Sequence, residues 1–297
     1  MGVNIAILLF CGGFWGLSFT LSRMVMAGGG HPLAVTFWHS AAMAALIWAA
    51  LALLGRAPRI DRAFLRFVPV LGVLGGAAPS FLLFLAAQNV GAGILSVCMA
   101  TVPLMQIGLS ALLKIEPFRA RRLFGLVLAL SAVWIIADPD RGAAPALWVA
   151  VATLGAFSYA CEDSFIALRR PPGLSSPQIL AGMTLFAALY TAPALLFVDP
   201  APLSLSEPGR PELAFALTVP GSLLAYGLFV HLIGRAGPVF ASQVAYVVTI
   251  TGVLAGGAIL GEEWPPAFWL GLGLIVAGLA LGLPRPRAFR ASEAAGG

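Results

Sequence analysis

"GAGILSVCMATVPLMQIGLSALL", residues 91–113, contains no charged residue. A helix needs about 20 mostly apolar residues to cross the hydrocarbon core of a bilayer. A membrane strand would alternate apolar and polar residues over about 10 positions, whereas this run is continuously apolar. The stretch therefore predicts a membrane-spanning helix.

Similar runs recur along most of the chain, which is 60% hydrophobic and only 10% charged. These fractions lie outside the range of ordinary soluble domains. The first run has no basic residue before it, so we expect it to be retained and not cleaved as a signal peptide. The sequence predicts an all-α integral membrane protein with ten transmembrane helices, at 4–27, 33–54, 67–88, 91–113, 123–137, 146–168, 178–198, 213–234, 238–260 and 266–283.

The basic residues divide unevenly between the two sides of the predicted membrane. Ten spans place both termini on one side, and the positive-inside rule makes that side the cytoplasm. The outer side keeps only Arg23, Arg141 and Arg210 of the 17 basic residues. Since topology accounts for the net charge of +5, we expect no nucleic-acid partner. The cytoplasmic side receives Arg56, Arg59, Arg62, Arg66, Lys114, Arg119, Arg121, Arg122, Arg169, Arg170, Arg235, Arg285, Arg287 and Arg290.

The motifs of common enzymes are missing from the sequence. It has no Ser/His/Asp grouping, zinc-protease motif, phosphate-binding loop or dinucleotide fingerprint in a suitable context. Cys11, Cys98 and Cys161 lie within apolar runs and suggest neither a disulfide framework nor a metal site. We therefore expect no metal, no cofactor and no enzymatic activity, and we exclude ATP as the driving force.

The chain carries an internal repeat. An offset of 146 residues aligns 67–135 with 213–281 without a gap, and the turns and acidic punctuation of the two segments correspond. Each half holds five spans, an odd number, so the second half enters the membrane upside down. This organisation predicts two inverted five-helix repeats, 1–140 and 141–284, followed by a cytoplasmic tail, 285–297.

Several motifs add a family resemblance to this pattern. The first run contains "FWGLSF" at 14–19, tight turns precede the fourth and ninth runs, and "GEE" at 261–263 closes the ninth. With the five-plus-five duplication, the chain resembles the EamA-type drug/metabolite transporter superfamily, and most of all the YddG branch of bacterial amino-acid exporters. The resemblance implies a bacterial inner-membrane carrier whose pathway is lined by the first four helices of each half. The first half departs from it, with "KIEP" at 114–117 where the second half has "LGEE".

Small and polar residues form stripes on four of the predicted helices. In 91–113 the stripe is Ser96, Met99, Pro103, Gln106 and Ser110, beside Thr101, and its repeat counterpart includes Thr249, beside Tyr246. In 67–88 it is Gly72, Gly76, Pro79 and Leu83, beside Ser80, and its counterpart includes Phe229, beside Tyr226. Such stripes also serve close helix packing. Four stripes in register across the repeat favour a cavity.

Two prolines interrupt these helices near their middles. Pro79 and Pro103 each lack an amide N–H, which leaves the carbonyl of Gly75 or Met99 without its usual partner. A tolerated kink, a hinge and a ligand contact are all consistent with this pattern. Met99 adds a flexible apolar contact for variable side chains.

Glu162 and Asp163 are adjacent carboxylates inside the run 146–168. Adjacent helical positions point about 100° apart, so the two acids face different neighbours, and Tyr159 borders both faces. In one interpretation they pair with Arg169 and Arg170, two turns further on, which reach toward the membrane interface. In the other they bind a substrate ammonium or a coupling proton, as intramembrane acids commonly do.

We predict a secondary transporter that exports small amphipathic metabolites, with amino acids, including hydrophobic and aromatic ones, as the expected substrates. Trp15 would stack against the substrate, although ordinary packing explains it equally well. A multidrug or other metabolite carrier is the nearest alternative, and a lipid-modifying membrane enzyme is the alternative from another class. Gly271, Gly278 and Gly282 on the last helix allow either a homodimer contact or internal packing. The predicted substrate-binding residues are Trp15, Pro79, Ser80, Leu83, Met99, Thr101, Pro103, Tyr159, Glu162, Tyr226, Phe229, Tyr246 and Thr249.

Overall fold

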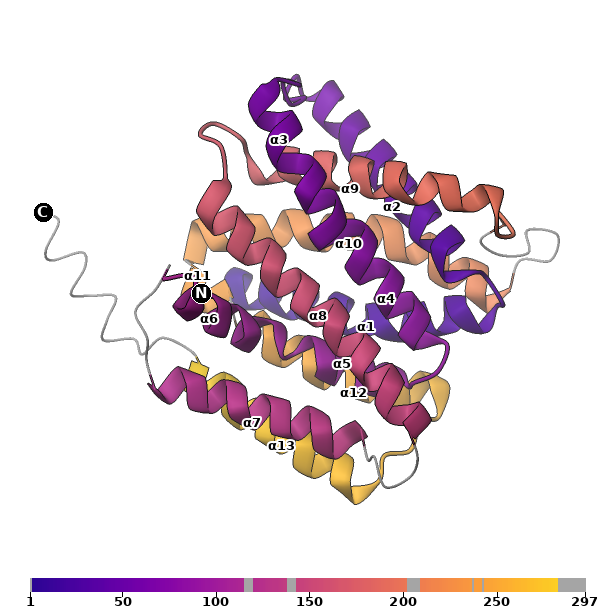
Figure 1. The fold of residues 1–297 in the computed structure, drawn as a ribbon, viewed down its shortest axis with the longest axis vertical. Helices are drawn as coiled ribbons and strands as arrows, with labels where there is room; N and C mark the ends of the chain where they lie inside the picture. The colour runs from indigo at the N-terminus through magenta and orange to yellow at the C-terminus, as the bar shows by residue number, and fades with distance from the viewer. Residues whose placement is uncertain are drawn as a thin grey trace, which may run out of the picture.

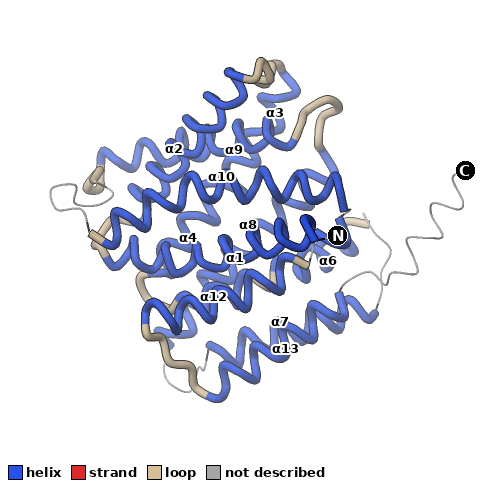
Figure 2. The backbone as a smooth tube through the Cα atoms, turned by 180° about the vertical axis from the view of Figure 1, so that it is seen from behind, coloured by secondary structure: helices blue, strands red, loops and turns tan. Residues whose placement is uncertain are grey.

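The computed structural model describes residues 2–114, 120–137, 143–201, 209–236, 238–241 and 243–282. Within these ranges the chain is helical and forms no strand (Figures 1 and 2). The first part comprises α1 (Gly2–Ala27), α2 (Pro32–Leu53), α3 (Arg62–Leu71), η1 (Gly72–Ala77), α4 (Ala78–Ala87), α5 (Ala92–Met99), α6 (Val102–Leu112) and α7 (Ala120–Ala137). The second part comprises α8 (Ala143–Arg169), α9 (Ser176–Thr191), η3 (Ala192–Leu196), α10 (Arg210–Ala236), α11 (Pro238–Ala241), α12 (Val244–Leu260) and α13 (Pro266–Gly282).

Six helical segments in the described ranges are long and apolar enough to cross a membrane. Three shorter apolar helices, Leu123–Ile136, Val244–Leu260 and Pro266–Leu281, accompany them. Many large apolar side chains on their outer faces are exposed, such as Trp134, Leu254 and Trp269, as expected for a surface that meets lipid. The all-α integral membrane class is therefore confirmed.

Prolines interrupt two of the predicted spans. Residues Gly72–Ala77, before Pro79, form a π-helical turn between α3 and α4. The helix that contains 91–113 is broken at Ala100 and Thr101, and Pro103 then stands in the first turn of α6. Both interruptions follow from the missing proline N–H, which removes one bond of the helical ladder.

The helices pair in a regular way. α1 packs against α10 and α12, whereas α8 packs against α4, α5 and α6. Two further pairs are α2 with α9 and α5 with α12. α7 and α13 lie side by side at one edge of the bundle, as both views of the chain show (Figures 1 and 2).

The pairing of α7 with α13 answers the question of the glycines on the last helix. A Cβ on Gly278 would lie 2.7 Å from the carbonyl oxygen of Gly125, and a Cβ on Gly271 would lie 2.6 Å from Cγ1 of Ile136. Both glycines thus allow α13 to approach α7 within the same chain. The structure therefore gives these two glycines internal packing, and the homodimer stays a prediction without support from them.

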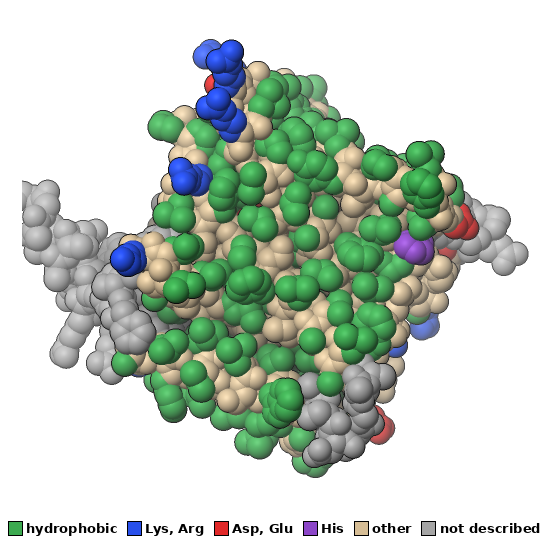
Figure 3. Space-filling model, in the orientation of Figure 1, with side chains coloured by type: hydrophobic (Ala, Val, Ile, Leu, Met, Phe, Trp, Pro, Cys, Tyr) green, Lys and Arg blue, Asp and Glu red, His purple; other side chains and the backbone are tan. Residues whose placement is uncertain are grey.

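Charged side chains gather at the two ends of the bundle (Figure 3). We call one end the basic end; it carries Arg56, Arg59, Arg62, Arg66, Arg169 and Arg170 in the loops after α2 and α8 and at the start of α3. The connections from α1 to α2 and from α4 to α5 lie at the opposite end, as do the end of η3 and the start of α10 (Figure 1). Glu116, Arg119, Arg141, the boundary at 140–141 and the tail 285–297 lie outside the described residues.

Candidate substrate site

Glu162 and Asp163 lie on the protein-facing side of α8. Both side chains are half-buried, while Leu147, Leu154 and Phe157 on another face of the helix are exposed. The acids therefore avoid lipid, where a charge at the bilayer centre costs about 2.5–3.5 kcal/mol even on the most lenient scale.

Gly75 in the π-helical turn makes room for Glu162. A Cβ added to Gly75 would lie 2.2 Å from Cδ of Glu162 and 2.4 and 2.5 Å from its two oxygens. Any other residue at this position would displace the carboxylate. The carboxyl group of Glu162 is thus pressed against bare backbone where η1 crosses α8.

The ion pairs that the sequence suggested are not formed. Within the described ranges no salt bridge joins Glu162 or Asp163 to Arg169 or Arg170, and neither carboxylate accepts a hydrogen bond. Arg170 instead donates from Nε and Nη2 to the carbonyl oxygen of Leu174, at 3.1 and 2.8 Å. The guanidinium is therefore used to hold the turn after α8, which leaves both carboxylates unpaired.

Two tyrosines and a serine stand around the acids. Tyr159 on α8 lies close to Ser80 on α4 and to Glu162, and its hydroxyl interacts with both. Tyr226 on α10 lies close enough to Glu162, Asp163 and Arg170 to interact electrostatically with all three. Its hydroxyl also donates to the carbonyl oxygen of Ser176 at 3.4 Å. Four of the predicted site residues, Ser80, Tyr159, Glu162 and Tyr226, are therefore brought together.

The carbonyl left without its partner by Pro79 is that of Leu74. In the π-helical register the N–H of Ala78 reaches Val73, so the next bond would join residue 79 to Leu74. Because proline has no N–H, Ser158 supplies the donor instead, with Oγ 2.7 Å from the Leu74 carbonyl oxygen. The expectation that Gly75 would carry the free carbonyl was wrong, since a single π turn shifts the register by one residue.

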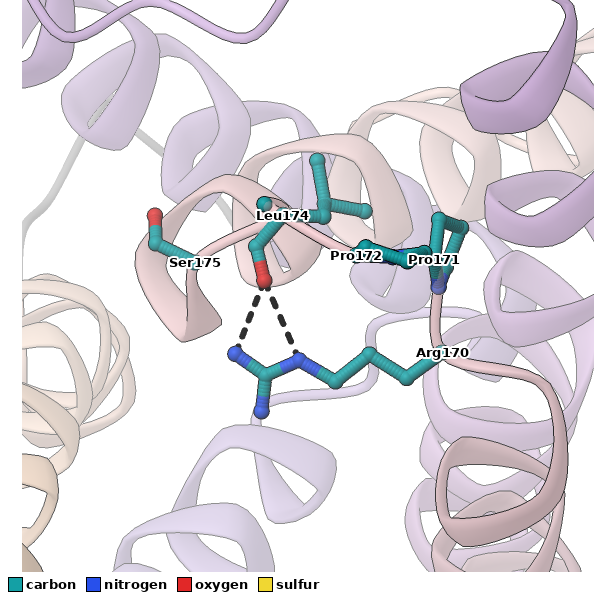
Figure 4. Close-up of a pocket in the computed structure, with 6 residues that line it drawn as sticks. Arg170, Pro171, Pro172, Leu174 and Ser175 are labelled. Atoms are coloured by element: carbon teal, nitrogen blue, oxygen red, sulfur yellow. Dashed lines mark hydrogen bonds between the residues drawn. The ribbon is translucent and has the colours of Figure 1, made fainter.

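Arg170 also borders a cavity at the basic end (Figure 4). The cavity has a volume of about 460 Å³ and is lined by Arg170, Pro171, Pro172, Gly173, Leu174 and Ser175. Two guanidinium nitrogens bond to Leu174, and the third, Nη1, has no bond to any described residue (Figure 4). Ser176, whose carbonyl accepts from Tyr226, directly follows this loop. The cavity thus lies on the basic side of the Tyr226 and Glu162 group.

A second set of predicted residues packs nearby. Trp15 and Phe229 meet edge to face, with ring centroids 5.0 Å apart. Phe229 lies three residues after Tyr226 on α10, which places the two on neighbouring positions of one face. Leu83 and the Pro79 carbonyl contact α8 beside Gly155. Met99 packs with Met105, Ala156 and Ala160, so it also lies beside α8.

Other predicted residues lie apart from the acids. Thr101 and Thr249 are fully buried, and their hydroxyls donate to Cys98 and Ala245 of their own chain segments at 2.6 and 2.9 Å. Tyr246 packs against the apolar cluster between α5, α7, α12 and α13. Pro103 stands half-buried in the first turn of α6. The structure thus gives the two threonines roles within their own helices.

Two residues of this region were not on the list of predicted binding residues. Gly75 matters through its contact with Glu162, and Arg170 through the cavity and its closeness to Tyr226. The sequence pointed to Gly75 because its carbonyl was predicted to lack a partner, whereas in the structure Gly75 matters because it makes room for Glu162. Among the described residues, no group of His, Cys, Asp and Glu side chains is arranged to hold a metal ion.

Comparison with known proteins settles the family. The model of the EamA-like transporter family matches the chain twice, over residues 3–137 and 146–283. The chain belongs to the EamA-like transporter family. The name of this family is that of membrane transporters. The matches do not assign it to the YddG branch.

Relatives and a solved structure agree with this family. The chain is similar to the uncharacterized inner membrane transporter YedA of Escherichia coli K12, with 29% identity over 65% of this chain and 62% of YedA. The YedA proteins of E. coli O6:H1 and O157:H7 match equally. The alignments thus span less than two thirds of these relatives. One crystal structure, described only as the structure of a protein, has a similar fold. The alignment covers 95% of this chain and 97% of the chain in that structure, with a TM-score of 0.63 and 17% identity. That match shows the fold alone.

Proposed function

We propose that the protein is a secondary carrier that exports small amphipathic metabolites, with amino acids as its substrates, from the cytoplasm across a bacterial inner membrane. The observation that carries this proposal is the pair of unpaired carboxylates on α8, set among Tyr159, Tyr226 and Ser80. An acid kept inside a membrane helix without a partner costs stability, so a use for its charge is expected. The inner-membrane location rests on the name of the YedA relatives.

The carrier is proposed to have ten spans in two inverted five-helix repeats. The two separate family matches and the helix pairing support this division. Under the repeat, α1 corresponds to α8, α3–α4 to α10, and α5–α6 to α12. The packing of α1 on α10 and α12 then has the same form as the packing of α8 on α4, α5 and α6. Alternating access follows from such repeats when one half rocks against the other.

Both termini are proposed to face the cytoplasm, because the basic end carries most of the described Lys and Arg residues. The opposite end then faces the outside. Export would begin at the basic end, where the cavity beside Arg170 lies.

Charges of both signs support amino acids over simple amines or anions. Glu162 would bind the ammonium group or a coupling proton, and Arg170 presents its unbonded Nη1 on the cavity for a carboxylate. Trp15, Phe229 and Leu83 would hold the apolar side chain. Selection among hydrophobic and aromatic side chains should be broad, because apolar pockets discriminate poorly.

The test is uptake of labelled phenylalanine by purified protein in liposomes, with and without an imposed pH gradient. We expect carrier-dependent uptake that the gradient accelerates, and a Glu162→Gln variant whose uptake ignores the gradient. Glu263→Gln is the matched control, because Glu263 is an exposed acid far from α8 in the sequence. Uptake in Glu162→Gln that still responds to the gradient would exclude Glu162 as the coupling group. No uptake of amino acids by the wild type would exclude this substrate class and favour a multidrug or other metabolite carrier.

A further inference from the structure

Glu262 joins the two family-matched segments at the opposite end of the bundle. Its Oε1 accepts a hydrogen bond from the backbone N–H of Ala92 at 2.7 Å, and its Oε2 accepts one from Gly93 at 3.2 Å. Ala92 and Gly93 form the first turn of α5, whose N–H groups have no partners within the helix. A carboxylate at a helix N-terminus also meets the positive end of the helix dipole.

The local sequence is shaped for this contact. Gly261 adopts a left-handed conformation with φ of 67° and ends α12, which turns the next residue toward α5. A Cβ on Gly256 would lie 2.4 Å from Oε2 of Glu262, so only glycine leaves the carboxylate its place. The ring of Trp264 lies directly over Gly93. Glu262 is therefore fitted into the α5 terminus and is not a loosely placed surface acid.

Other contacts close the same end. Arg23 near the end of α1 donates from Nη1 to the carbonyl oxygen of Ala87, the last residue of α4, at 2.5 Å. An apolar cluster beneath it combines Val25 of α1, Phe84 of α4, Leu95 of α5 and Val149 of α8. These helices belong to both matched segments, so their contact seals the opposite end.

The two segments also meet toward the basic end, where Phe64 and Phe67 of α3 pack with Ile179 of α9. The region between α8 and α10 differs, because the carboxylates of Glu162 and Asp163 are unpaired there and α8 and α10 have little direct backbone contact in the described ranges. The opposite end is thus closed by polar and apolar contacts, whereas two acids without partners lie toward the basic end.

We infer that the hydrogen bonds between Glu262 and the first turn of α5 keep the carrier closed toward the outside. Opening there requires the two segments to separate, and separation breaks both hydrogen bonds between Glu262 and α5. Charge-assisted bonds of this kind are stronger than neutral ones, so their loss favours the outward-open state. The inference rests on the proposed alternation between two halves, and it makes Glu262 a positioning residue that has no contact with substrate.

The native Cys98 reports on this seal. Its side chain is 1% exposed and belongs to the apolar cluster at the opposite end. In a background where Cys11 and Cys161 are replaced by alanine, a charged, membrane-impermeant thiol reagent is applied to cells with a permeabilised outer membrane. We expect Glu262→Gln to raise the labelling rate of Cys98 by about tenfold, since loss of a hydrogen bond to a charged group shifts an equilibrium by at least that factor. Glu263→Gln, which removes the neighbouring exposed charge, should label at the wild-type rate.

Two results would overturn the inference: labelling in Glu262→Gln at the wild-type rate, or an equal rise in Glu263→Gln. Thermal unfolding shows whether each variant is folded. If Glu262→Gln does not fold, Gly256→Ala displaces the same carboxylate without changing it, and the same rise is expected. The phenylalanine assay on the same proteins separates the two proposals. Normal phenylalanine uptake together with unchanged labelling in Glu262→Gln rejects only the proposed role of Glu262. Absent uptake by the wild type rejects the proposed function.

Discussion

At the scale of single residues, the site is defined by charges that lack partners. The carboxylate of Glu162 lies against the backbone of Gly75 and, among the described residues, has no cation within bonding distance. Two of the three guanidinium nitrogens of Arg170 donate to the carbonyl oxygen of Leu174 in the loop after α8. Tyr226 lies near both. In the proposed function Glu162 binds an ammonium group inside the bundle and Arg170 binds a carboxylate at the basic end. Eight residues separate the two, about 12 Å along the helix axis, so one amino acid would meet them in succession.

Arg170→Gln should therefore change selectivity more than overall transport. We expect phenylalanine uptake to fall about tenfold, as loss of one charge-assisted bond implies, while phenethylamine, which has no carboxylate, is transported as before. Competition between the two compounds in liposomes measures this ratio. Arg169→Gln is the control, because Arg169 is exposed and its substitution removes the same charge from the neighbouring position. An equal change in both variants would mean that only the charge of the basic end matters.

At the scale of elements, the interrupted segment α3–η1–α4 depends on α8. Ser158 replaces the backbone donor that Pro79 lacks, so one hydroxyl connects the two helices at the point where the backbone ladder is broken. The same crossing holds Glu162 against Gly75. The site and the interruption are thus one structural unit.

Ser158→Ala should lower the free energy of unfolding by about 1–3 kcal/mol, because the Leu74 carbonyl would lose its donor within the membrane. Thr153→Val is the control on the same helix, since the Thr153 hydroxyl donates to the carbonyl oxygen of Val149, one turn earlier in α8. Thermal unfolding in detergent compares the two. Equal losses would show that Ser158 contributes nothing beyond an ordinary helical hydroxyl.

At the scale of the whole molecule, α7 and α13 form a separate pair at the edge of the bundle (Figure 1). Gly125 and Gly278 face each other across it. The pair packs on α6 and α12 through an apolar cluster that includes Leu104 and Val253, so we assign it a structural role within one chain.

Gly278→Leu should destabilise the protein by about 1–3 kcal/mol, the usual cost of overpacking, without changing its oligomeric state. Gly273→Leu should be tolerated, because a Cβ there meets nothing within 4 Å. Unfolding temperature and light scattering after size exclusion measure the two effects. A dimer of the wild type that Gly278→Leu converts to a stable monomer would contradict the internal role.

The sequence predicted much of this whole-molecule picture, because long apolar runs permit little else than membrane helices. It also selected Ser80, Tyr159, Glu162 and Tyr226 as polar residues in apolar surroundings, and the structure places these four near one another. It could not reveal that Glu162 meets Gly75, since that contact joins residues far apart in the chain and leaves no periodic pattern. The sequence also could not reveal that the hydroxyls of Thr101 and Thr249 donate to nearby carbonyl oxygens of the same segment.

The π turn at Gly72–Ala77 makes the two proposed repeats differ in structure. Its counterpart in the proposed repeat, residues 218–223, lies within the α-helix α10. One additional residue in a turn rotates all that follows by about 100°, so the two halves present different side chains to the pathway although their sequences align without a gap. In a carrier with two alike inverted repeats, the inward-open and outward-open states would be related by a two-fold axis in the membrane plane and would have equal energy. The halves of this protein are unlike, so the proposed alternation would have a preferred resting side, even in a membrane without gradients.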